Sequence, residues 1–241
     1  MIDFHNHILP NVDDGSKSIE MSIDMLKEAQ YQGITDVVNT VHLQHPKMHD
    51  KNVKYDFLIG EIKKLQDTIN LLDLKINIHL AAEVFYLPNL LEVSNNHFFS
   101  TIGNRKYMLI EFASTIFPIG YEDEFYKLQL EGITPIIAHP ERYRFIQNDI
   151  SILEDWIRRD FIIQLDAGSL IGKFGRATKE VAYNILKNDC MHIIGSDAHN
   201  NNNRNFCLKE AYELIEKSTS ADRVEKLKLN VCKILRGKNI F

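Results

Sequence analysis

Nine histidine, aspartate and glutamate residues stand where metal ligands could lie, in or just after short apolar segments. In chain order they are His5, His7, Asp14, His42, Glu83, Glu111, His139, Asp197 and His199. Imidazole and carboxylate groups suit divalent ions such as zinc, manganese and iron, and no cysteine joins the set. Because one ion takes about four to six ligands, the set predicts two or three ions that share carboxylates.

The first two candidates, His5 and His7, have a single residue between them in a segment typical of a strand. Side chains alternate between the two faces of a strand, so both imidazoles can reach one ion. Asp13 and Asp14 follow in a DDGS stretch, which is also a typical turn and helix-start signal. We expect Asp14 to be a ligand, and Asp13 to cap the next helix or hold the loop.

Short apolar segments alternate with longer amphipathic ones along the chain. Seven segments rich in Ile, Val or Phe fit strands, and several are apolar on both faces, as in a buried parallel sheet. They are MIDF at the start, 34–41, 74–82, 107–112, 133–139, 161–168 and 191–197. Helical spacing predicts helices at 17–32, 51–73, 121–131, 149–159, 176–188, 205–218 and 221–235, and the segment 84–105 is expected to hold a short helix and a loop.

This alternation predicts an α/β protein with a parallel sheet and outer helices. The length of 241 residues and the lack of a linker predict one domain over residues 1–241. Periodicity leaves a closed barrel and an open doubly wound sheet as alternatives. In both, the C-terminal strand ends form the active-site edge. Six of the seven predicted strands present a candidate ligand there, and so many buried like charges would be costly without cations.

Composition argues against several classes of protein. The net charge is −5 and there is no basic stripe, so nucleic acid is not expected as a partner. The three cysteines are an odd number without paired spacing, which indicates a reduced, cytoplasmic compartment. Neither a signal-peptide pattern nor a window near 18 apolar residues is present, so we expect a soluble protein that does not insert into membranes.

Five short motifs resemble those of the polymerase and histidinol phosphatase (PHP) superfamily. They are FHNH at 4–7, VH at 41–42, AAE at 81–83, AHPERY at 138–143 and GSDAH at 195–199. The opening DFHNHILPNVDDGSKS, together with AHPERY, resembles one branch: the metal-dependent protein-tyrosine phosphatases of bacterial capsule and exopolysaccharide operons, of the CpsB, CapC and YwqE type. The resemblance covers residues 1 to about 218 and implies a single-domain, distorted (β/α)7 TIM-like barrel, the PHP fold, with a trinuclear metal site.

The resemblance also implies how the nine ligands divide among the ions. The implied sets are His5, His7, Glu83 and Asp197 for one ion, Glu83 as a bridge with Glu111 and His139 for a second, and Asp14, His42 and His199 for a third. The ions are expected to be manganese, with iron, zinc and magnesium as alternatives.

Two arginines are expected to contact the phosphate. Arg142, in HPER, matches the catalytic, phosphate-binding arginine of the family, and Arg204 follows GSDAH as a second contact. The chain departs from the family pattern in TVHLQHP, which changes the substrate-facing rim from Leu43 to His49. There, His45 and His49 are interpreted as exposed loop residues, with substrate contact as the alternative.

Four further residues receive a supporting interpretation. Glu141 is expected to orient Arg142 or the backbone. Asp166 is expected either to support a ligand histidine from outside the metal shell or to form a turn. Trp156 is expected in the core, and His192 is expected to be structural.

The implied reaction is hydrolysis of phosphotyrosine. Bound divalent ions lower the pKa of water and so supply hydroxide near neutral pH. The planar guanidinium of Arg142 suits stabilisation of charge on the phosphoryl oxygens. A cysteine nucleophile would instead need an arginine six residues later. The residues at that spacing are Ser196 after Cys190, Glu213 after Cys207 and Lys238 after Cys232.

Two rival functions stay open. A small-molecule phosphoesterase such as histidinol phosphatase would need almost the same site, although HPERY and DDGS favour the tyrosine phosphatase. A non-catalytic regulatory subunit would be expected to have lost ligands, and none of the nine is lost. The resemblance implies as substrate the phosphotyrosyl tail of a membrane-associated bacterial tyrosine kinase that regulates capsule or exopolysaccharide synthesis. An oligomer is possible.

Overall fold

Seven parallel strands in sequential order form the centre of the protein, whose computed structural model describes residues 1–48 and 54–241. The strands are β1 (Ile2–Asn6), β2 (Asp36–Leu43), β3 (Asn77–Phe85), β4 (Tyr107–Glu111), β5 (Thr134–Ala138), β6 (Ile162–Asp166) and β7 (Ile193–Gly195). The segment after β7 returns to β1: the amide of His7 donates to the carbonyl of Ala198 at 2.8 Å, and the amide of Asp197 donates to that of His5 at 2.8 Å. This contact closes the sheet into a barrel, which resolves the alternative that periodicity left open.

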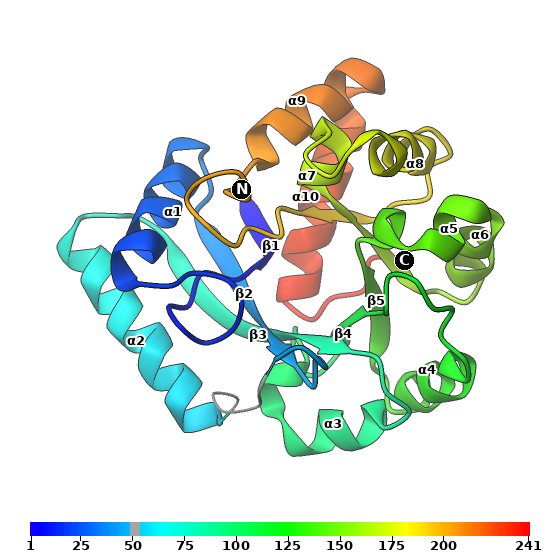
Figure 1. The fold of residues 1–241 in the computed structure, drawn as a ribbon, viewed down its shortest axis with the longest axis horizontal. Coiled ribbons are helices and arrows are strands. Elements are labelled where there is room, and N and C mark those ends of the chain that lie inside the picture. Colours follow the sequence, from blue (N-terminus) through cyan, green and yellow to red (C-terminus); the bar gives the residue numbers. More distant parts are fainter. Residues whose placement is uncertain (49–53) are drawn as a thin grey trace.

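Helices surround the strands (Figure 1). They are α1 (Ile19–Tyr31), α2 (Tyr55–Leu71), α3 (Leu90–Asn96), α4 (Tyr121–Leu130), α5 (Arg144–Asn148), α6 (Ser151–Arg158), α7 (Ala167–Ile171), α8 (Arg176–Lys187), α9 (Leu208–Ser218) and α10 (Ala221–Leu235), with short 3-10 turns at Phe98–Ser100 and Pro140–Arg142. The predicted helix at 149–159 is shorter than expected, and the five-residue helices α5 and α7 were not predicted. They are too short to show helical periodicity in the sequence.

Two strands begin and end two or three residues later in the chain than predicted. The strand predicted at 34–41 lies at Asp36–Leu43, and that predicted at 74–82 lies at Asn77–Phe85. Their pairing is continuous from Asp36 beside Asn77 to Leu43 beside Val84. His42 and Glu83 therefore lie inside strands and are not residues that follow them, so the rigid ladder itself fixes their backbones.

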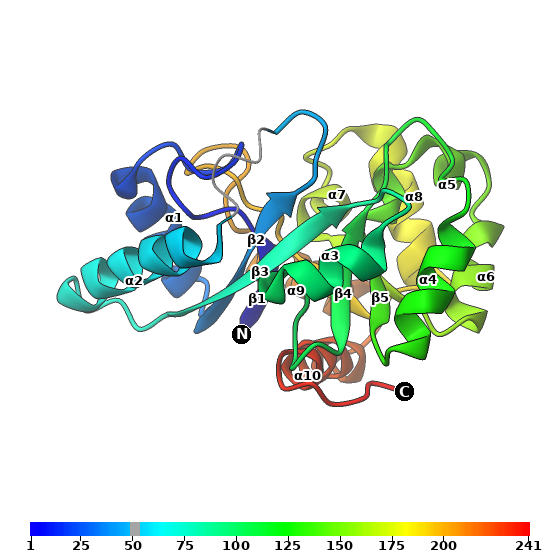
Figure 2. The same ribbon diagram turned by 90° about the horizontal axis from the view of Figure 1, so that it is seen from below.

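The barrel interior is filled by inward-pointing apolar side chains and is closed at one end by α10. Phe4, Val38 and Leu109 belong to this inner cluster, and Val231 and Ile234 join it from α10. Figure 2 shows α10 beneath the strands, at their N-terminal ends. With that end occupied, the opposite end of the barrel, where the strands finish, is the one that can hold a site.

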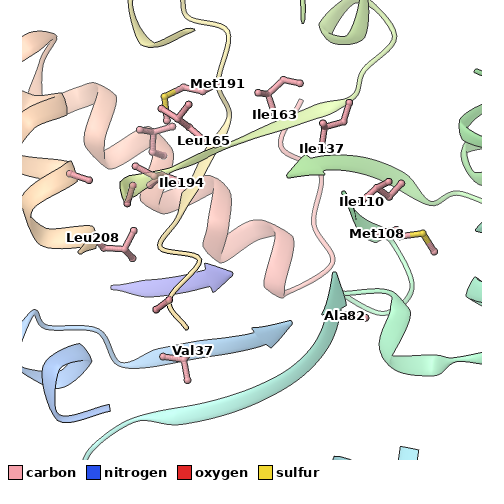
Figure 3. Close-up of a cluster of buried hydrophobic side chains, with 14 of the residues drawn as sticks. Val37, Ala82, Met108, Ile110, Ile137, Ile163, Leu165, Met191, Ile194 and Leu208 are labelled. Carbon is pink, nitrogen blue, oxygen red and sulfur yellow. The ribbon is translucent and has the colours of Figure 1, made fainter. Parts of the chain in front are cut away.

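A second apolar layer lies between the strands and the outer helices. Figure 3 shows part of it, including Val37, Met108, Ile137 and Leu165, whose side chains leave the strands on the outer face. Trp156 is fully buried in this layer, as predicted. Over residues 1–48 and 54–241, no helix combines the length and the apolar character needed to cross a bilayer.

Strand β1 contains an irregularity that matters for the site. Its pairing with β2 shifts register between Asp3 and Asn6. Phe4 belongs to the inner apolar cluster, and yet the adjacent His5 also faces the interior, where its ring contacts Gln164. A bulge of this kind re-aims a side chain. It lets β1 supply both a core residue and, from the next position, a polar one.

Candidate metal centre

All nine predicted ligands meet at the C-terminal end of the barrel. Among the described residues, three groups have ligand atoms that all lie within 4.8 Å of one another. The groups are His5, His7, Glu83 and Asp197; His7, Asp14, His42 and His199; and His42, Glu83 and Glu111. The ninth residue, His139, joins through its Nε2, which lies 2.8 Å from Oε1 of Glu83.

The innermost group has the spacing of a metal cage. Nε2 of His5 lies 3.1 Å from Oε2 of Glu83 and 3.4 Å from Oδ1 of Asp197. Nε2 of His7 lies 3.4 Å from each of the same two oxygens. Four tetrahedral ligands at about 2.1 Å from an ion are about 3.4 Å apart, so this group fits a divalent ion.

The second group is open to solvent on one side. Oδ1 of Asp14 lies 3.3 Å from Nε2 of His42 and 3.2 Å from Nε2 of His199. The side chain of Asp14 is 43% exposed, whereas both histidines are buried. These three residues are the set that the resemblance implied for a third ion, and His7 lies close enough to join them.

Glu83 lies between the groups and presents its two oxygens to different partners. Oε1 faces His139, whereas Oε2 faces His5 and lies 3.3 Å from Nδ1 of His42. That arrangement suits a bridging carboxylate. The position of Glu111 differs from the one that the resemblance implied. Its Oε2 lies 3.9 Å from Nδ1 of His42. Glu111 therefore groups with His42 and Glu83, and not with His139.

The electrostatics of the centre favour cations. Burial, and then repulsion from Glu83 and Asp197, raises the pKa of Glu111 well above its usual value. Burial, and then the charge of Arg142, lowers the pKa of His139 to about 4, which keeps its imidazole in the neutral, metal-binding form. Among the described residues, the buried atoms without a hydrogen-bond partner include Oδ1 of Asp197 and Oε2 of Glu111. Divalent ions would satisfy these atoms and relieve the repulsion.

Two of the predicted ligands have a strained backbone. The φ angles of His139 and Asp197 are +34° and +46°, a region that residues other than glycine rarely adopt. Such strain persists only where surrounding structure enforces it, and it gathers at functional sites. His139 directly follows the end of β5, and Asp197 lies two residues after the end of β7, where the chain turns over the barrel rim.

Two buried polar residues orient the histidines of the innermost group. Oδ2 of Asp13 lies 2.8 Å from Nδ1 of His7, and Oε1 of Gln164 lies 3.1 Å from Nδ1 of His5. Each contact holds Nδ1, so that Nε2 is left for the ion. Asp13 also accepts from the amide of Gly15 and so holds the loop, as expected, but the helix cap is Ser18.

Sequence reasoning missed the role of Gln164 and the full role of Asp13. A signal was present for Gln164, an amide inside an otherwise apolar strand segment, FIIQLD. The small size of Gly195 makes room for it. A Cβ there would lie 2.4 Å from Nε2 of Gln164 and 2.8 Å from Cβ of His5.

The two arginines lie together beside the innermost group. Nη1 of Arg142 and Nη2 of Arg204 donate to the same oxygen, Oδ2 of Asp197, at 2.6 and 2.7 Å. Arg142 also forms an ion pair with Asp166, and its guanidinium lies 3.9 Å from the ring centre of Phe174. Phe174 was not predicted as part of the site, since a single aromatic in a polar loop carries no motif.

The interpretation of Asp166 and Glu141 is refined. Asp166 supports Arg142 and not a ligand histidine, and it also caps α7 by accepting from the amide of Ser169 at 3.2 Å. Asp166 therefore has both of the roles considered, as a supporting residue and as a turn residue. The residue that it supports is Arg142 and not a histidine. Glu141 accepts from the amide of Asp166 at 3.2 Å, so it orients the backbone beside the arginine.

The rim of the centre corrects one prediction. His45, expected to be an exposed loop residue, is only 13% exposed in its side chain, and its Nε2 lies 3.6 Å from Oε2 of Glu111. It lines, with Lys47, Arg142 and Arg204, a pocket of about 190 Å³ over the ligands. The edge of the Phe85 ring holds it there, with ring centres 5.1 Å apart. His49 lies outside the described residues.

Comparison with known proteins decides the family. Residues 1–236 match the family described as "Capsular polysaccharide synthesis, CpsB/CapC". The chain belongs to the CpsB/CapC family. Staphylococcus aureus CapC, provisionally named a tyrosine-protein phosphatase, is 35% identical over 212 residues, which are 88% of this chain and 82% of CapC. The tyrosine-protein phosphatase YwqE of Bacillus subtilis is 33% identical over 245 residues, with 100% of this chain and 94% of YwqE covered.

Solved structures agree with this family and with the barrel. Crystal structures of YwqE from Bacillus subtilis and CpsB from Streptococcus pneumoniae, described as unique metal-dependent tyrosine phosphatases, include a match with a TM-score of 0.93 at 31% identity. It covers 100% of this chain and 96% of the matched one. The histidinol phosphate phosphatase of Lactococcus lactis matches with a TM-score of 0.56 at 18% identity over 91% of this chain and 94% of its own, which shows a shared fold. The CpsB/CapC chain thus has the PHP-type barrel that its motifs predicted.

Proposed function

We propose that this CpsB/CapC-family protein is a metal-dependent protein-tyrosine phosphatase, as its curated relatives are named. The observation that carries the proposal is the placement of Arg142 and Arg204 on Asp197, a residue of the innermost ligand group. Two cations beside a multi-metal cage can hold the phosphoryl oxygens of a monoester where metal-activated water would attack.

The nine ligands divide in this proposal as the resemblance implies. His5, His7, Glu83 and Asp197 hold one ion, and Asp14, His42 and His199 hold another. Glu83, Glu111 and His139 complete a third position, which the contact of His139 with Glu83 and the closeness of Glu111 to Glu83 support. Manganese is the proposed ion, because imidazole and carboxylate ligands without sulfur suit it. When bound, such ions provide positive charge for the phosphoryl oxygens and a water of lowered pKa.

The protein's own residues orient the substrate. The planar guanidinium of Arg142 is held on three sides, by Asp166, Asp197 and the face of Phe174, so its position is set before a phosphate arrives. Arg204 is held by Asp197 and, at 5.7 Å, lies further from the ring centre of Phe174 than Arg142 does. It contacts the phosphate from the solvent side. The leaving phenolate has a reference pKa of about 10, so it departs readily.

We further propose that residues 1–241 form one domain that acts in the cytoplasm. Its substrate would be the phosphotyrosyl tail of a membrane-associated tyrosine kinase that regulates capsule or exopolysaccharide synthesis. The family description, which concerns capsular polysaccharide synthesis, supports this pathway. A disordered tail suits a pocket that is open to solvent at Asp14.

The deciding experiment measures bound metal and turnover of a phosphotyrosyl peptide for the wild type, Arg142→Lys and Arg142→Ala. We expect two or three ions per chain in all three proteins. We expect Arg142→Ala to lose at least about a hundredfold in kcat/KM, because removing a preorganised donor typically lowers kcat by a factor of about 10²–10³. The loss should be smaller for the lysine variant. Full activity of Arg142→Ala would refute the role of this residue.

Two controls separate the rival functions. Chelation is expected to abolish turnover, whereas thiol alkylation is expected to spare it, since Cys207 is buried and burial raises its pKa to about 12. Histidinol phosphate is assayed beside the peptide. Faster turnover of histidinol phosphate would favour the small-molecule enzyme, and fewer than two ions with no turnover of either substrate would favour a non-catalytic subunit.

A further inference from the structure

The loop that joins β4 to α4 (Figure 1) presents apolar side chains to solvent. Ile116, Phe117 and Ile119 are 65%, 42% and 88% exposed. With Phe85 and Tyr86 of the β3 end they line a cavity of about 250 Å³, called here the Phe85–Ile119 pocket. Surface loops are usually polar, and grouped exposed apolar residues mark a binding surface.

Contacts from the fold hold the pocket in shape. The hydroxyl of Tyr86 donates to the carbonyl of Ile119 at 2.9 Å. The ring of Phe117 meets the rings of Tyr121 and Phe145 edge to face, with ring centres 5.9 and 5.3 Å apart. The pocket is therefore formed before any ligand binds, which lowers the entropic cost of binding.

The pocket lies beside the metal centre. Phe85 lies two residues beyond Glu83 on β3 and pairs with Glu111 on β4. The same Phe85 ring contacts His45 on the rim of the metal pocket. At about 3.3 Å per strand residue, the Phe85 backbone lies about 7 Å from that of Glu83. A peptide held by its phosphotyrosine over the metals can reach this far with its first or second neighbouring residue, because extended chains span up to about 3.6 Å per residue.

The edge of the pocket is acidic. Glu122 and Asp123 are exposed in the first turn of α4, just after the loop. Burial, and then Glu124, Glu122 and Asp123, raises the pKa of Tyr86, so the carboxylates act on the pocket. An acidic side chain beside the phosphotyrosine is therefore disfavoured there, and an apolar one is favoured.

We propose that the Phe85–Ile119 pocket binds an apolar side chain located within two residues of the phosphotyrosine in a peptide substrate. The proposal rests on the proposed phosphatase function and adds a specificity subsite to it. A second copy of the chain is a poorer occupant, because a stable interface takes about 20–30 residues a side and the exposed apolar cluster offers three.

The test compares three substrates on the manganese-loaded protein: p-nitrophenyl phosphate, and two glycine-flanked phosphotyrosyl peptides with either leucines or aspartates within two residues of the phosphotyrosine. The variants are Ile116→Asp and Ile119→Asp. The matched controls are Leu130→Asp and Leu71→Asp, at exposed apolar positions on α4 and α2 with 67% and 88% exposure.

We expect the wild type to prefer the leucine peptide by about tenfold in kcat/KM, a ratio worth about 1.4 kcal/mol. Both pocket variants should lose that preference, mainly through KM, whereas p-nitrophenyl phosphate turnover and both control variants stay unchanged. Equal loss on p-nitrophenyl phosphate would mean that the pocket holds the aryl ring itself and would overturn the proposal. A wild type without the preference would also overturn it.

The remaining outcomes are equally decisive. If Ile119→Asp changes only the molar mass measured by light scattering, a second copy covers the pocket and the proposal is wrong. If the wild type hydrolyses all three substrates alike, the subsite fails but the phosphatase function stands. If the wild type hydrolyses none of them, the proposed function fails, and the subsite fails with it.

Discussion

Arg142 and Arg204 share one oxygen of Asp197, although they come from different loops of the barrel rim. The other oxygen of the same carboxylate faces His5 and His7. Asp197 therefore connects the two arginines proposed to bind phosphate with the innermost group of predicted ligands. The two arginines differ in support, since Arg142 also pairs with the buried Asp166 and lies closer to Phe174.

Arg204→Gln is predicted to weaken substrate binding more than it slows the chemical step. Its side chain is 30% exposed and leaves Asp197 still paired with Arg142. We expect kcat/KM on a phosphotyrosyl peptide to fall about tenfold, mostly through KM, as for the loss of a partly solvated ionic contact. Arg158→Gln, on the surface of α6, is the control. An unchanged KM would contradict this role.

Gln164→Met is predicted to lower metal affinity. Methionine keeps much of the volume of glutamine but cannot accept from Nδ1 of His5, so the ring loses its fixed orientation. Loss of such a supporting contact typically costs about 10–100-fold in metal affinity. Calorimetric titration of the metal-free protein with manganese measures it. The control is Gln129→Met: the Gln129 amide donates to the Arg159 carbonyl at the surface, so this variant should bind manganese as the wild type does.

Metal removal is predicted to lower thermal stability. The predicted ligands come from β1, β2, β3 and β4 and from the segments after β1, β5 and β7, so bound ions would stabilise only the closed barrel. At a hundredfold excess over the dissociation constant, one ion adds about 2.7 kcal/mol. Chelation should therefore lower Tm by about 5–10 °C, and addition of manganese should restore it. A Tm that does not respond to chelation would count against the centre.

His192 is predicted to destabilise the fold in mild acid. Its Nδ1 accepts from the amide of Ile163 at 3.0 Å and must be unprotonated to do so. Burial, and then Arg223, lowers its pKa to about 4, against about 6.5 in the unfolded chain. Between these values the unfolded chain binds a proton that the folded chain does not. The free energy of unfolding is therefore unaffected by this group above pH of about 6.5 and falls below it, by up to about 3 kcal/mol at pH 4.

The His192→Asn variant isolates this contribution. Its amide oxygen can accept the same hydrogen bond without titrating, so the variant should lose less stability between pH 7 and pH 4 than the wild type. Urea unfolding at both values measures the difference, and titration of the metal centre cancels because both proteins contain it. His97→Asn, at the end of α3, should follow the wild type. Parallel curves for all proteins would show that His192 does not carry the effect.

The architecture was largely predictable because its signals are periodic. Seven apolar strands and the long helices repeat along the sequence, and the ligands recur at strand ends. Closure of the barrel was not predictable from periodicity, because it depends on backbone bonds of His5 and His7 to the segment at Asp197 and Ala198, far along the chain. The later bounds of β2 and β3 depend likewise on pairing between strands.

The metal centre was more predictable than its surroundings. Ligands are recognisable by residue type and place, whereas Gln164, Asp166 and Phe174 act through contacts that only the folded chain creates. His45 was misjudged for the same reason. Its loop sequence reads as exposed, but the tertiary contact with Phe85 turns it over the centre. The Phe85–Ile119 pocket likewise depends on a tertiary contact, between the end of β3 and the loop that joins β4 to α4.

The hydrogen bonds between β1 and the segment after β7 also affect when the barrel can close during synthesis. His5 and His7 emerge from the ribosome first, whereas Asp197 and His199, their partners in the cage, come almost two hundred residues later. A nascent chain that ends before β7 has only part of each of the two histidine-rich ligand groups and no contact to close its first strand. Neither of these two groups can therefore be complete before the last strand has been made. A chain released earlier would have an open strand edge and unpaired members of both groups.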